Sequence, residues 1–433
     1  MSEVLVIGGG LAGVEAAWQL ARAGIKVTLA EMKPQKFSPA HKSAGLAELV
    51  CSNSLKAIRI SSAAGMLKAE MELFGSLCVE SAKMCSVPAG GALAVDRDEF
   101  SRIVTEKIEN EPLIALERRE VSQIPEDGTV IVAAGPLASA PLAETISFLC
   151  GGALSFFDAA APIVTAESID MNRAFSQSRY DRGGEDDYIN CPMNREEYEI
   201  FHKALIEAES AELHEFDQKK DVYEGCMPIE VMAARGLDTI RFGPLRPVGL
   251  RDPVTGHRPW AVLQLRREDN AGMLFNLVGF QTNLKFGEQK RVFSLIPALK
   301  NAEYVRYGVM HRNTFIDSPR LLNADFGFRQ RPNLFFAGQI TGVEGYMESA
   351  ASGMLAGLNA AKKIHGQDPL ILPAETMLGA LTGYISSFQG KDFQPMGANF
   401  GILPPLETQI RDKRLRYEAL AIRGLEAAAQ VIA

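Results

Sequence analysis

The sequence of 433 residues lacks several features that mark whole classes of proteins. Its longest apolar runs, such as Val130–Gly135, are far shorter than the roughly 18 residues that cross a bilayer, and no basic leader precedes the first apolar run. Six cysteines are scattered without any Cys-x-x-Cys pair, and the six histidines do not cluster with them. We therefore expect a cytoplasmic protein without a membrane span, a metal site or a dithiol redox pair.

The composition is that of a globular protein, with 47% hydrophobic and 23% charged residues. A chain of this length predicts two domains. The formal net charge of −8 disfavours nucleic acid as a partner, but lysine and arginine gather in segments 241–267 and 285–312. In a reducing compartment the thiols stay free, and Cys78 and Cys150 have the apolar neighbours of small buried hydrophobes.

The strongest local pattern lies at the start of the chain. A short apolar run, Val4–Ile7, leads into GGGLAG at residues 8–13, and a helix is expected over Leu11–Ala23. The next strand, Lys26–Ala30, ends at an acid, Glu31. Strand, glycine turn, helix and strand make a β-α-β unit, which predicts a parallel sheet covered by helices.

Such a turn is typical of dinucleotide binding. Gly8 permits a tight turn, Gly10 lets the backbone approach a pyrophosphate, and Gly13 lets the helix pack on the strand. The helix start presents free N–H groups to the phosphates, and a carboxylate at Glu31 accepts hydrogen bonds from a ribose. The predicted cofactor-binding residues of this turn are Gly8, Gly9, Gly10, Leu11, Ala12, Gly13 and Glu31.

A similar pattern of strand, glycine turn and helix recurs near the end of the chain. The strand Leu334–Ala337 is followed by Gly338 and further glycines, and then by a helix of small residues over Met347–Ile364. The glycine motif alone does not distinguish FAD from NAD as the cofactor. The second strand and glycine turn favour FAD, because the flavin is longer and needs a second binding surface. Gly338 and Tyr346, whose ring is placed to stack on the isoalloxazine, complete the predicted cofactor site.

These patterns predict an α/β fold in which a Rossmann-like FAD-binding domain is discontinuous and carries an inserted α+β domain. Near residue 160 the apolar, glycine-containing pattern gives way to alternating acidic and basic residues, and near residue 333 the first pattern returns. We expect the FAD-binding domain over residues 1–160 and 326–433, and the inserted domain over residues 161–325.

Long segments in the rest of the chain carry a family pattern. They read ELVCSNSLKA at 48–57, EGCMPIEVMAARG at 224–236, DTIRFGPLRPVGL at 238–250, NLVGFQTNLKFGEQKRVF at 276–293, RYGVMHRNT at 306–314, FFAGQITGVEGYMESAASG at 335–353 and FQPMGANFGILPPL at 393–406. In order and content the chain resembles the folate- and FAD-dependent tRNA (uracil-5-)-methyltransferase family, TrmFO, which is related to the larger GidA-like flavoproteins.

The resemblance implies a reaction. A one-carbon unit from 5,10-methylenetetrahydrofolate is reduced by FADH2 and placed on carbon five of a T-loop uridine in tRNA, and NADPH or NADH reduces the flavin again. Uracil carbon five needs activation by a thiolate that adds to carbon six, and then a base that removes the proton from carbon five. The resemblance assigns these two roles to Cys51 and Cys226. We favour Cys226 as the nucleophile and Cys51 as the base or flavin-side thiol.

Basic residues of the middle region are candidates for RNA phosphates or for the folate glutamate tail. They are Arg246, Lys285, Lys290, Arg291, Arg306, His311 and Arg312. Three alternatives stay open at this stage. One is a paralogue that methylates ribosomal RNA by the same chemistry, a second is an NAD(P)H-dependent flavin oxidoreductase of a small substrate, and the third is a non-enzymatic RNA-binding factor.

Overall fold

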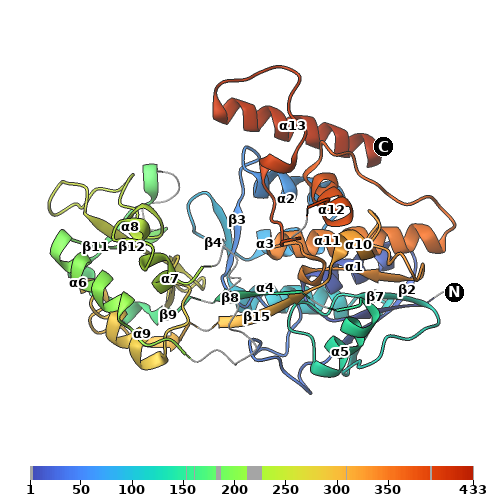
Figure 1. Cartoon of the computed structure of the whole chain (residues 1–433), viewed down its shortest axis with the longest axis horizontal. Coiled ribbons are helices and arrows are strands. Elements are labelled where there is room, and N and C mark those ends of the chain that lie inside the picture. Colours follow the sequence, from blue (N-terminus) through green and yellow to red (C-terminus); the bar gives the residue numbers. More distant parts are fainter. Residues whose placement is uncertain are drawn as a thin grey trace.

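The computed structural model describes residues 3–152, 154–159, 161–181, 187–211, 227–308, 310–390 and 393–432; for residues 154–159, 181, 311 and 312 the description covers the backbone only. Two bodies lie side by side (Figure 1). One carries both ends of the chain, and the other is formed by the middle of the sequence. No helix in the described ranges is long and apolar enough to cross a membrane.

The first body is built on a five-stranded parallel sheet, with the order β16-β7-β1-β2-β6. The strands are β1 (Glu3–Ile7), β2 (Lys26–Glu31), β6 (Ile114–Arg118), β7 (Thr129–Val132) and β16 (Leu334–Phe336). The edge strand β16 therefore pairs with β7, about 200 positions earlier in the chain. The expected discontinuous Rossmann-like fold is confirmed.

Two long helices pack tightly on this sheet. They are α1 (Leu11–Arg22) and α11 (Tyr346–Ile364), which come from opposite ends of the chain. A Cβ added at Gly353 would lie 2.0 Å from the Ala12 carbonyl oxygen, and one at Gly357 would lie 2.6 Å from that of Ala16. The small residues of the second helix are therefore needed for its backbone to approach the first.

Other helices complete this body. They are α2 (Ala63–Leu73), α3 (Leu77–Met84), α4 (Arg97–Glu109), α5 (Ala140–Leu149), α10 (Ser318–Leu321), α12 (Met377–Ser387) and α13 (Lys413–Ile432). The last of these runs along the top of Figure 1. Asp96, the N-cap of α4, accepts a hydrogen bond from the Glu99 backbone N–H at 3.1 Å. A side-chain acceptor at this position satisfies one N–H group of the first helical turn.

A short three-stranded sheet lies beside the cysteine segment. Strands β4 (Ser86–Val87) and β5 (Ala92–Val95) pair antiparallel. Strand β5 also pairs with β3 (Ser54–Ala57), and this pairing has a register shift. The sheet therefore connects to the residues that follow Cys51.

The second body contains a six-stranded antiparallel sheet with the order β10-β11-β12-β13-β9-β14. Its strands are β9 (Ile163–Thr165), β10 (Phe175–Ser176), β11 (Tyr188–Met193), β12 (Ala261–Arg267), β13 (Leu274–Leu277) and β14 (Tyr304–Arg306). Its helices are α6 (Arg195–Ile206), α7 (Ile229–Ala233), α8 (Thr239–Phe242) and α9 (Phe286–Phe293). The mixture of elements agrees with the expected inserted α+β unit.

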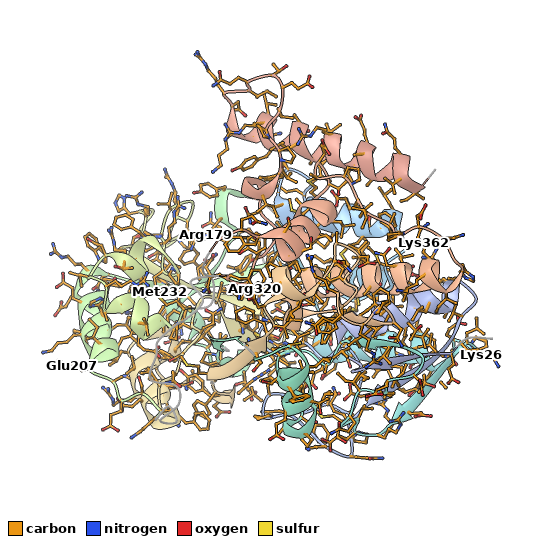
Figure 2. All side chains as sticks on the ribbon, turned by 45° about the vertical axis from the view of Figure 1, so that its right-hand side comes forward. Lys26, Arg179, Glu207, Met232, Arg320 and Lys362 are labelled. Carbon is orange, nitrogen blue, oxygen red and sulfur yellow. The ribbon has the colours of Figure 1, made fainter. Side chains whose placement is uncertain are left out.

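The two bodies have separate hydrophobic cores. An antiparallel pair, β8 (Leu154–Ala159) and β15 (Met310–Phe315), lies between them where the chain leaves and returns. Phe315 and Leu322 already belong to the first core, so the chain re-enters that core ahead of residue 326. Figure 2 shows Glu207 and Met232 on the inserted side and Lys26 and Lys362 on the opposite side. The domain limits remain our proposal.

Candidate functional site

A cleft opens at the carboxyl ends of β1 and β7, where the order of strands in the sheet reverses. Ligands of open α/β sheets bind at this position. The cleft holds about 1010 Å³ of space free of protein atoms, the space at its mouth included. Among the residues that line it are Gly8, Gly10, Leu11, Ala12, Glu31, Cys51, Gly338 and Tyr346. The fold therefore brings most of the predicted cofactor residues together with one of the two predicted cysteines.

The glycines of the turn have different tasks. Gly8 has φ +105°, and a Cβ there would meet the Ala133 carbonyl oxygen at 2.6 Å; at Gly13 the Cβ would lie 1.8 Å from the Gly8 carbonyl oxygen. At Gly10 nothing stands within 4 Å of an added Cβ. The protein itself therefore requires the first and third glycines, whereas the second faces open space, which leaves its backbone accessible to a ligand.

The start of α1 supports the same conclusion. Its N-cap is Gly10, and no side chain caps the helix. The free N–H groups and the positive end of the helix dipole are available to an anion. An added Cβ at Gly9 would lie 2.5 Å from the Leu46 side chain. Gly9 and Gly13 are not among the residues that line the cleft. They therefore allow the close packing of the turn on the side that faces away from the cleft.

Glu31 is 5% exposed and binds backbone N–H groups with both of its oxygens. Oε2 accepts from Gly9 at 2.7 Å, and Oε1 accepts from Lys33 at 2.9 Å. A carboxylate oxygen has a second lone pair, so each oxygen retains capacity for a ribose hydroxyl. The acid at the end of β2 therefore stabilises the glycine turn through the Gly9 N–H group.

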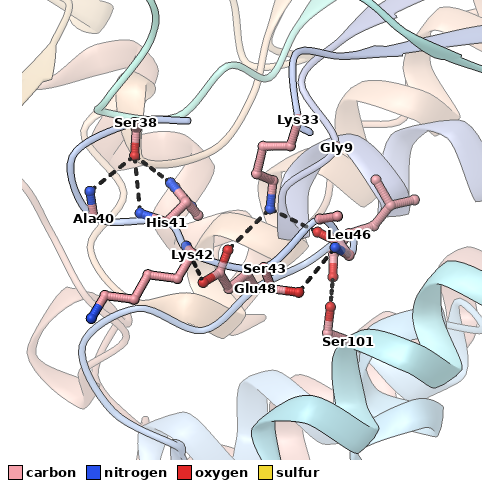
Figure 3. Close-up of polar contacts among 12 residues, drawn as sticks. Gly9, Lys33, Ser38, Ala40, His41, Lys42, Ser43, Leu46, Glu48 and Ser101 are labelled. Atoms are coloured by element: carbon pink, nitrogen blue, oxygen red, sulfur yellow. Dashed lines mark hydrogen bonds and ion pairs between the residues drawn. The ribbon is translucent and has the colours of Figure 1, made fainter. Parts of the chain in front are cut away.

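A cluster of polar residues that the sequence patterns had not indicated lines one wall of this cleft, and Figure 3 shows its hydrogen bonds. The Lys33 Nζ donates to the Gly45 carbonyl oxygen at 2.8 Å and lies 3.2 Å from Glu48 Oε2. The other oxygen of Glu48 accepts from the Lys42 N–H at 2.8 Å. His41 lies beside Ser38, and its pKa is lowered by burial and then by the Lys33 charge. Lys33, His41 and Glu48 thus form a hydrogen-bonded wall of the cleft.

Tyr346 joins the two halves of the cleft. Its hydroxyl oxygen accepts from the Cys51 N–H at 2.7 Å and from the Ser52 N–H at 3.2 Å. Burial, followed by the charge of Cys51, raises the pKa of Tyr346 well above its usual value. The hydroxyl therefore stays protonated at neutral pH and anchors the cysteine segment to the start of α11.

Arginines hold the cysteine segment from the other side. Arg97 donates to the carbonyl oxygens of Leu49 and Val50 at 3.0 and 3.1 Å, and it forms an ion pair of 2.6 Å with Glu268. From β12, Arg266 donates to Ser52 Oγ at 2.7 Å. The inserted domain thus contacts the cysteine segment directly, a contact that no sequence spacing had indicated.

Asn53 and Arg306 complete this cluster. The Asn53 side chain accepts from Arg266 at 2.9 Å and donates to the Arg267 carbonyl oxygen at 2.8 Å. The pKa of Arg306 is lowered by burial and next by the Arg97 charge, and Tyr346 and Cys51 act on it in the opposite direction. Of the predicted RNA or folate residues, Arg306 is the one whose described side chain interacts with the cysteine.

The remaining predicted residues are placed differently. Cys226 lies outside the described residues, as do the side chains of His311 and Arg312. On the inserted domain Lys285 pairs with Glu209 at 2.7 Å. Three more lie there as well, all exposed: Arg246, Lys290 and Arg291. Their surroundings are those of solvated surface charges.

The other cysteines behave mainly as apolar residues. Cys78 is fully buried, and burial raises its pKa well above the usual value, as expected for a structural thiol. Cys150 is only half-buried, so the expectation of a buried residue was wrong there, although desolvation still raises its pKa to about 12. The cysteines in the described ranges are free, and no group of three or more metal-ligating side chains occurs in the same ranges.

The parallel sheet, the glycine turn, the uncapped helix and the acid at the end of β2 define the class of the protein, an FAD-dependent flavoprotein with a Rossmann-type domain. Residues 3–368 match the family described as "Glucose inhibited division protein A". The structure of Aquifex aeolicus GidA has a TM-score of 0.71 at 16% identity and covers 99% of this chain and 73% of that one. At this identity the likeness concerns the fold.

Sequence comparison is more specific. The chain is 58% identical over 422 residues to methylenetetrahydrofolate--tRNA-(uracil-5-)-methyltransferase TrmFO of Acetivibrio thermocellus, which covers 97% of this chain and 96% of that protein. It is 57% identical over 429 residues to the protein of the same name from Listeria innocua, with 99% and 98% covered. The chain belongs to the GidA family and, within it, to the TrmFO family.

Proposed function

We propose that this protein methylates carbon five of a T-loop uridine in tRNA, with 5,10-methylenetetrahydrofolate as the one-carbon donor. Relatives named methylenetetrahydrofolate--tRNA-(uracil-5-)-methyltransferase TrmFO share 55–58% identity with this chain over nearly its whole length. The single structural observation that carries the proposal is the position of Cys51, which lines the same cleft as the dinucleotide turn. When bound, FAD supplies in its reduced form the hydride that converts a methylene into a methyl group.

In this cleft the chain binds and orients its cofactor with Gly10, Glu31 and the start of α1. Gly338 lines the same cleft opposite Ala12, whose Cβ lies 3.1 Å from the position of an added Cβ. We further propose that the Tyr346 ring stacks on the isoalloxazine. Its hydroxyl fixes the cysteine segment at the same time, so one side chain sets the distance between cofactor and thiol.

Two cysteines have the chemistry that the reaction needs. One thiolate adds to carbon six of uracil, carbon five then attacks the one-carbon unit, and a base removes the proton from carbon five before the thiolate leaves. We assign the addition to Cys226 and the proton transfer to Cys51. The location of Cys51 at the cofactor cleft supports the second assignment, and the Arg97 and Arg306 charges stabilise negative charge beside it.

NADPH or NADH completes the cycle by reducing the flavin again. This part of the proposal rests on the family resemblance, as does the location of the reaction in the cytoplasm. Arg306 is the favoured contact for RNA or for the folate tail because it lies beside the cysteine cluster. For Arg246, Lys285, Lys290 and Arg291 we keep phosphate contacts as a proposal, along with His311 and Arg312.

The labelled methylene of methylenetetrahydrofolate distinguishes the candidate reactions. Protein loaded with FAD is mixed with this donor, NADPH, unmodified tRNA and unmodified ribosomal RNA in a single-turnover experiment. We expect the label in T-loop uridine. Label that appears instead in ribosomal RNA supports the paralogue, and oxidation of NADPH without any labelled RNA supports a small-molecule oxidoreductase.

The cysteine roles are tested by Cys51→Ala and Cys226→Ala. Each is expected to abolish methyl transfer and to leave FAD content unchanged. Cys150→Ala is a matched control, because Cys150 is half-buried like Cys51 but lies outside the cleft. Wild-type turnover in either test variant removes that cysteine from the mechanism.

A further inference from the structure

Three aromatic rings form a ladder on the inserted domain, outside the flavin cleft. The centre of the Phe286 ring lies 4.9 Å from that of Tyr307, with an angle of 16° between the two planes. The Tyr307 ring in turn lies 5.2 Å from that of Tyr304, at an angle of 12°. We name these three side chains the aromatic platform. None of the three is among the residues that line the flavin cleft, so the platform is a separate feature of the surface.

The aromatic platform is held rigidly. Phe286 is the first residue of α9, and the tyrosines lie in β14 and directly after it. The buried Gln289 side chain joins these two segments, because its Nε2 donates to the Gly308 carbonyl oxygen at 2.8 Å and its Oε1 accepts from the Gly308 N–H at 2.8 Å. Tyr304 packs against the hydrophobic core of the inserted domain. The rings therefore lose little conformational freedom when a ligand binds.

The outer face of the ladder is open. Phe286 is 55% exposed although Tyr307 covers one face of its ring, so the opposite face is in contact with solvent. Burial of this apolar face against a partner is favourable. A planar aromatic ligand that stacks there would continue the ladder as its fourth ring.

A free cation lies on the same side of α9. Lys290 follows Phe286 by four positions, which places the two side chains on one face of the helix. Lys290 is exposed and forms no ion pair with a described residue, whereas Arg291 beside it is paired with Glu288. A nucleotide carries a planar base next to a negative phosphate. The open ring and the free lysine together therefore fit a nucleotide of an RNA chain better than an apolar peptide.

The chain connects the aromatic platform to the flavin cleft. Tyr307 precedes Asn313 of β15 by six positions, and Asn313 lines the cleft. Six residues span at most about 20 Å. At roughly 3.4 Å per nucleotide of a stacked strand, about six nucleotides cover that distance. An RNA loop whose target base enters the cleft can therefore reach the platform with another of its bases.

We propose that the aromatic platform stacks on an unpaired base of the tRNA arm, a few nucleotides away from the target uridine. The inference rests on the proposed function, which brings this arm to the cleft. A base inside a double helix is already stacked on both faces, so the open Phe286 ring selects a base of the loop. Stacking on this ring replaces contacts that the base loses when the loop opens to present the uridine to Cys51.

Two substitutions of the outer ring test the proposal. Phe286→Ala removes the ring, and we expect the Kd for a synthetic T-arm hairpin to rise at least fivefold. Phe286→Trp keeps a flat aromatic face, and its Kd should stay within twofold of the wild type. Phe148→Ala is the matched control, because Phe148 is a 92% exposed phenylalanine on α5 of the FAD-binding domain, and its Kd should not change. FAD content and the thermal midpoint of each variant show whether the fold is retained.

Hairpins with a single abasic position in the loop identify the stacked base. One of them is expected to bind the wild type as weakly as the intact hairpin binds Phe286→Ala, and the same abasic position should weaken binding to that variant no further. Lys290→Gln should reduce the slope of log Kd against log salt by about one unit. Lys362→Gln removes a lysine on the opposite side of the molecule (Figure 2) and should leave the slope unchanged.

Failure of the inference and failure of the proposed function give different results. The inference is overturned if Phe286→Ala binds the hairpin as tightly as the wild type, or if every abasic position weakens binding equally in both proteins. It is also overturned if this variant keeps its Kd for RNA and raises the KM for methylenetetrahydrofolate or NADPH, because the platform then serves a small ligand. In these cases transfer of label to tRNA by the wild type leaves the methylation proposal intact. If the wild type transfers no label to any tRNA, the proposed function fails, whatever Phe286→Ala does to hairpin binding.

Discussion

Replacing Tyr346 with phenylalanine removes one oxygen atom and leaves the ring in place. That oxygen accepts hydrogen bonds from the Cys51 and Ser52 N–H groups. Leaving a buried N–H without an acceptor costs about 1–3 kcal/mol. Both residues are half-buried, so water reaches them in part, and a total of about 2 kcal/mol is the expected cost. If this cost falls on the reactive geometry, methyl transfer slows by about 30-fold.

The assay measures FAD content and single-turnover methyl transfer in the same preparation. FAD content should match the wild type, because the ring and the glycine turn are unchanged. Tyr384→Phe is a matched control: its hydroxyl donates to the Gln394 carbonyl oxygen at 2.8 Å outside the cleft, and transfer should stay within twofold. Transfer at the wild-type rate in Tyr346→Phe would refute the anchoring role, and loss of FAD would show that the hydroxyl serves the cofactor instead.

Two further predictions concern the glycine turn and a buried lysine. Gly10→Ala should fold with unchanged stability as apoprotein but bind FAD at least 100-fold more weakly. Gly13→Ala should also destabilise the apoprotein, because its Cβ would lie 1.8 Å from the Gly8 carbonyl oxygen and force the backbone apart. Equal thermal stabilities of the two apoproteins would contradict this prediction. Burial lowers the pKa of Lys68 to about 8. The unfolded state keeps this proton up to pH 10.5 while the folded state has released it, so the free energy of unfolding should rise with pH between these values by up to about 1.4 kcal/mol per unit. Urea titrations at pH 8, 9 and 10 should show this rise in the wild type relative to Lys68→Met, and parallel curves would refute it.

The sequence by itself determined the nucleotide-binding half of the protein. Gly13 was predictable because the contact that requires it, with the Gly8 carbonyl oxygen, is local, within one β-α-β unit. Gly8 was predictable from the motif, although the backbone that it approaches is that of Ala133, beyond this unit. The return of the chain at β16 was predictable from a second strand and glycine turn. The reaction was implied by long segments with a family pattern, since such segments retain the residues that chemistry requires.

Only the tertiary structure decided how distant segments meet. Tyr346 was predicted as a stacking ring, but its hydrogen bonds to the Cys51 segment join residues almost 300 positions apart, and no periodicity reports such a contact. The same holds for Arg97 and Arg266, whose isolated side chains resemble ordinary surface charges in the sequence. The Arg241 guanidinium lies 3.8 Å from the centre of the Trp260 ring, which follows it by 19 positions along the chain. Local patterns determine turns and helices, whereas a site is formed by the packing of elements whose separation along the chain carries no signal.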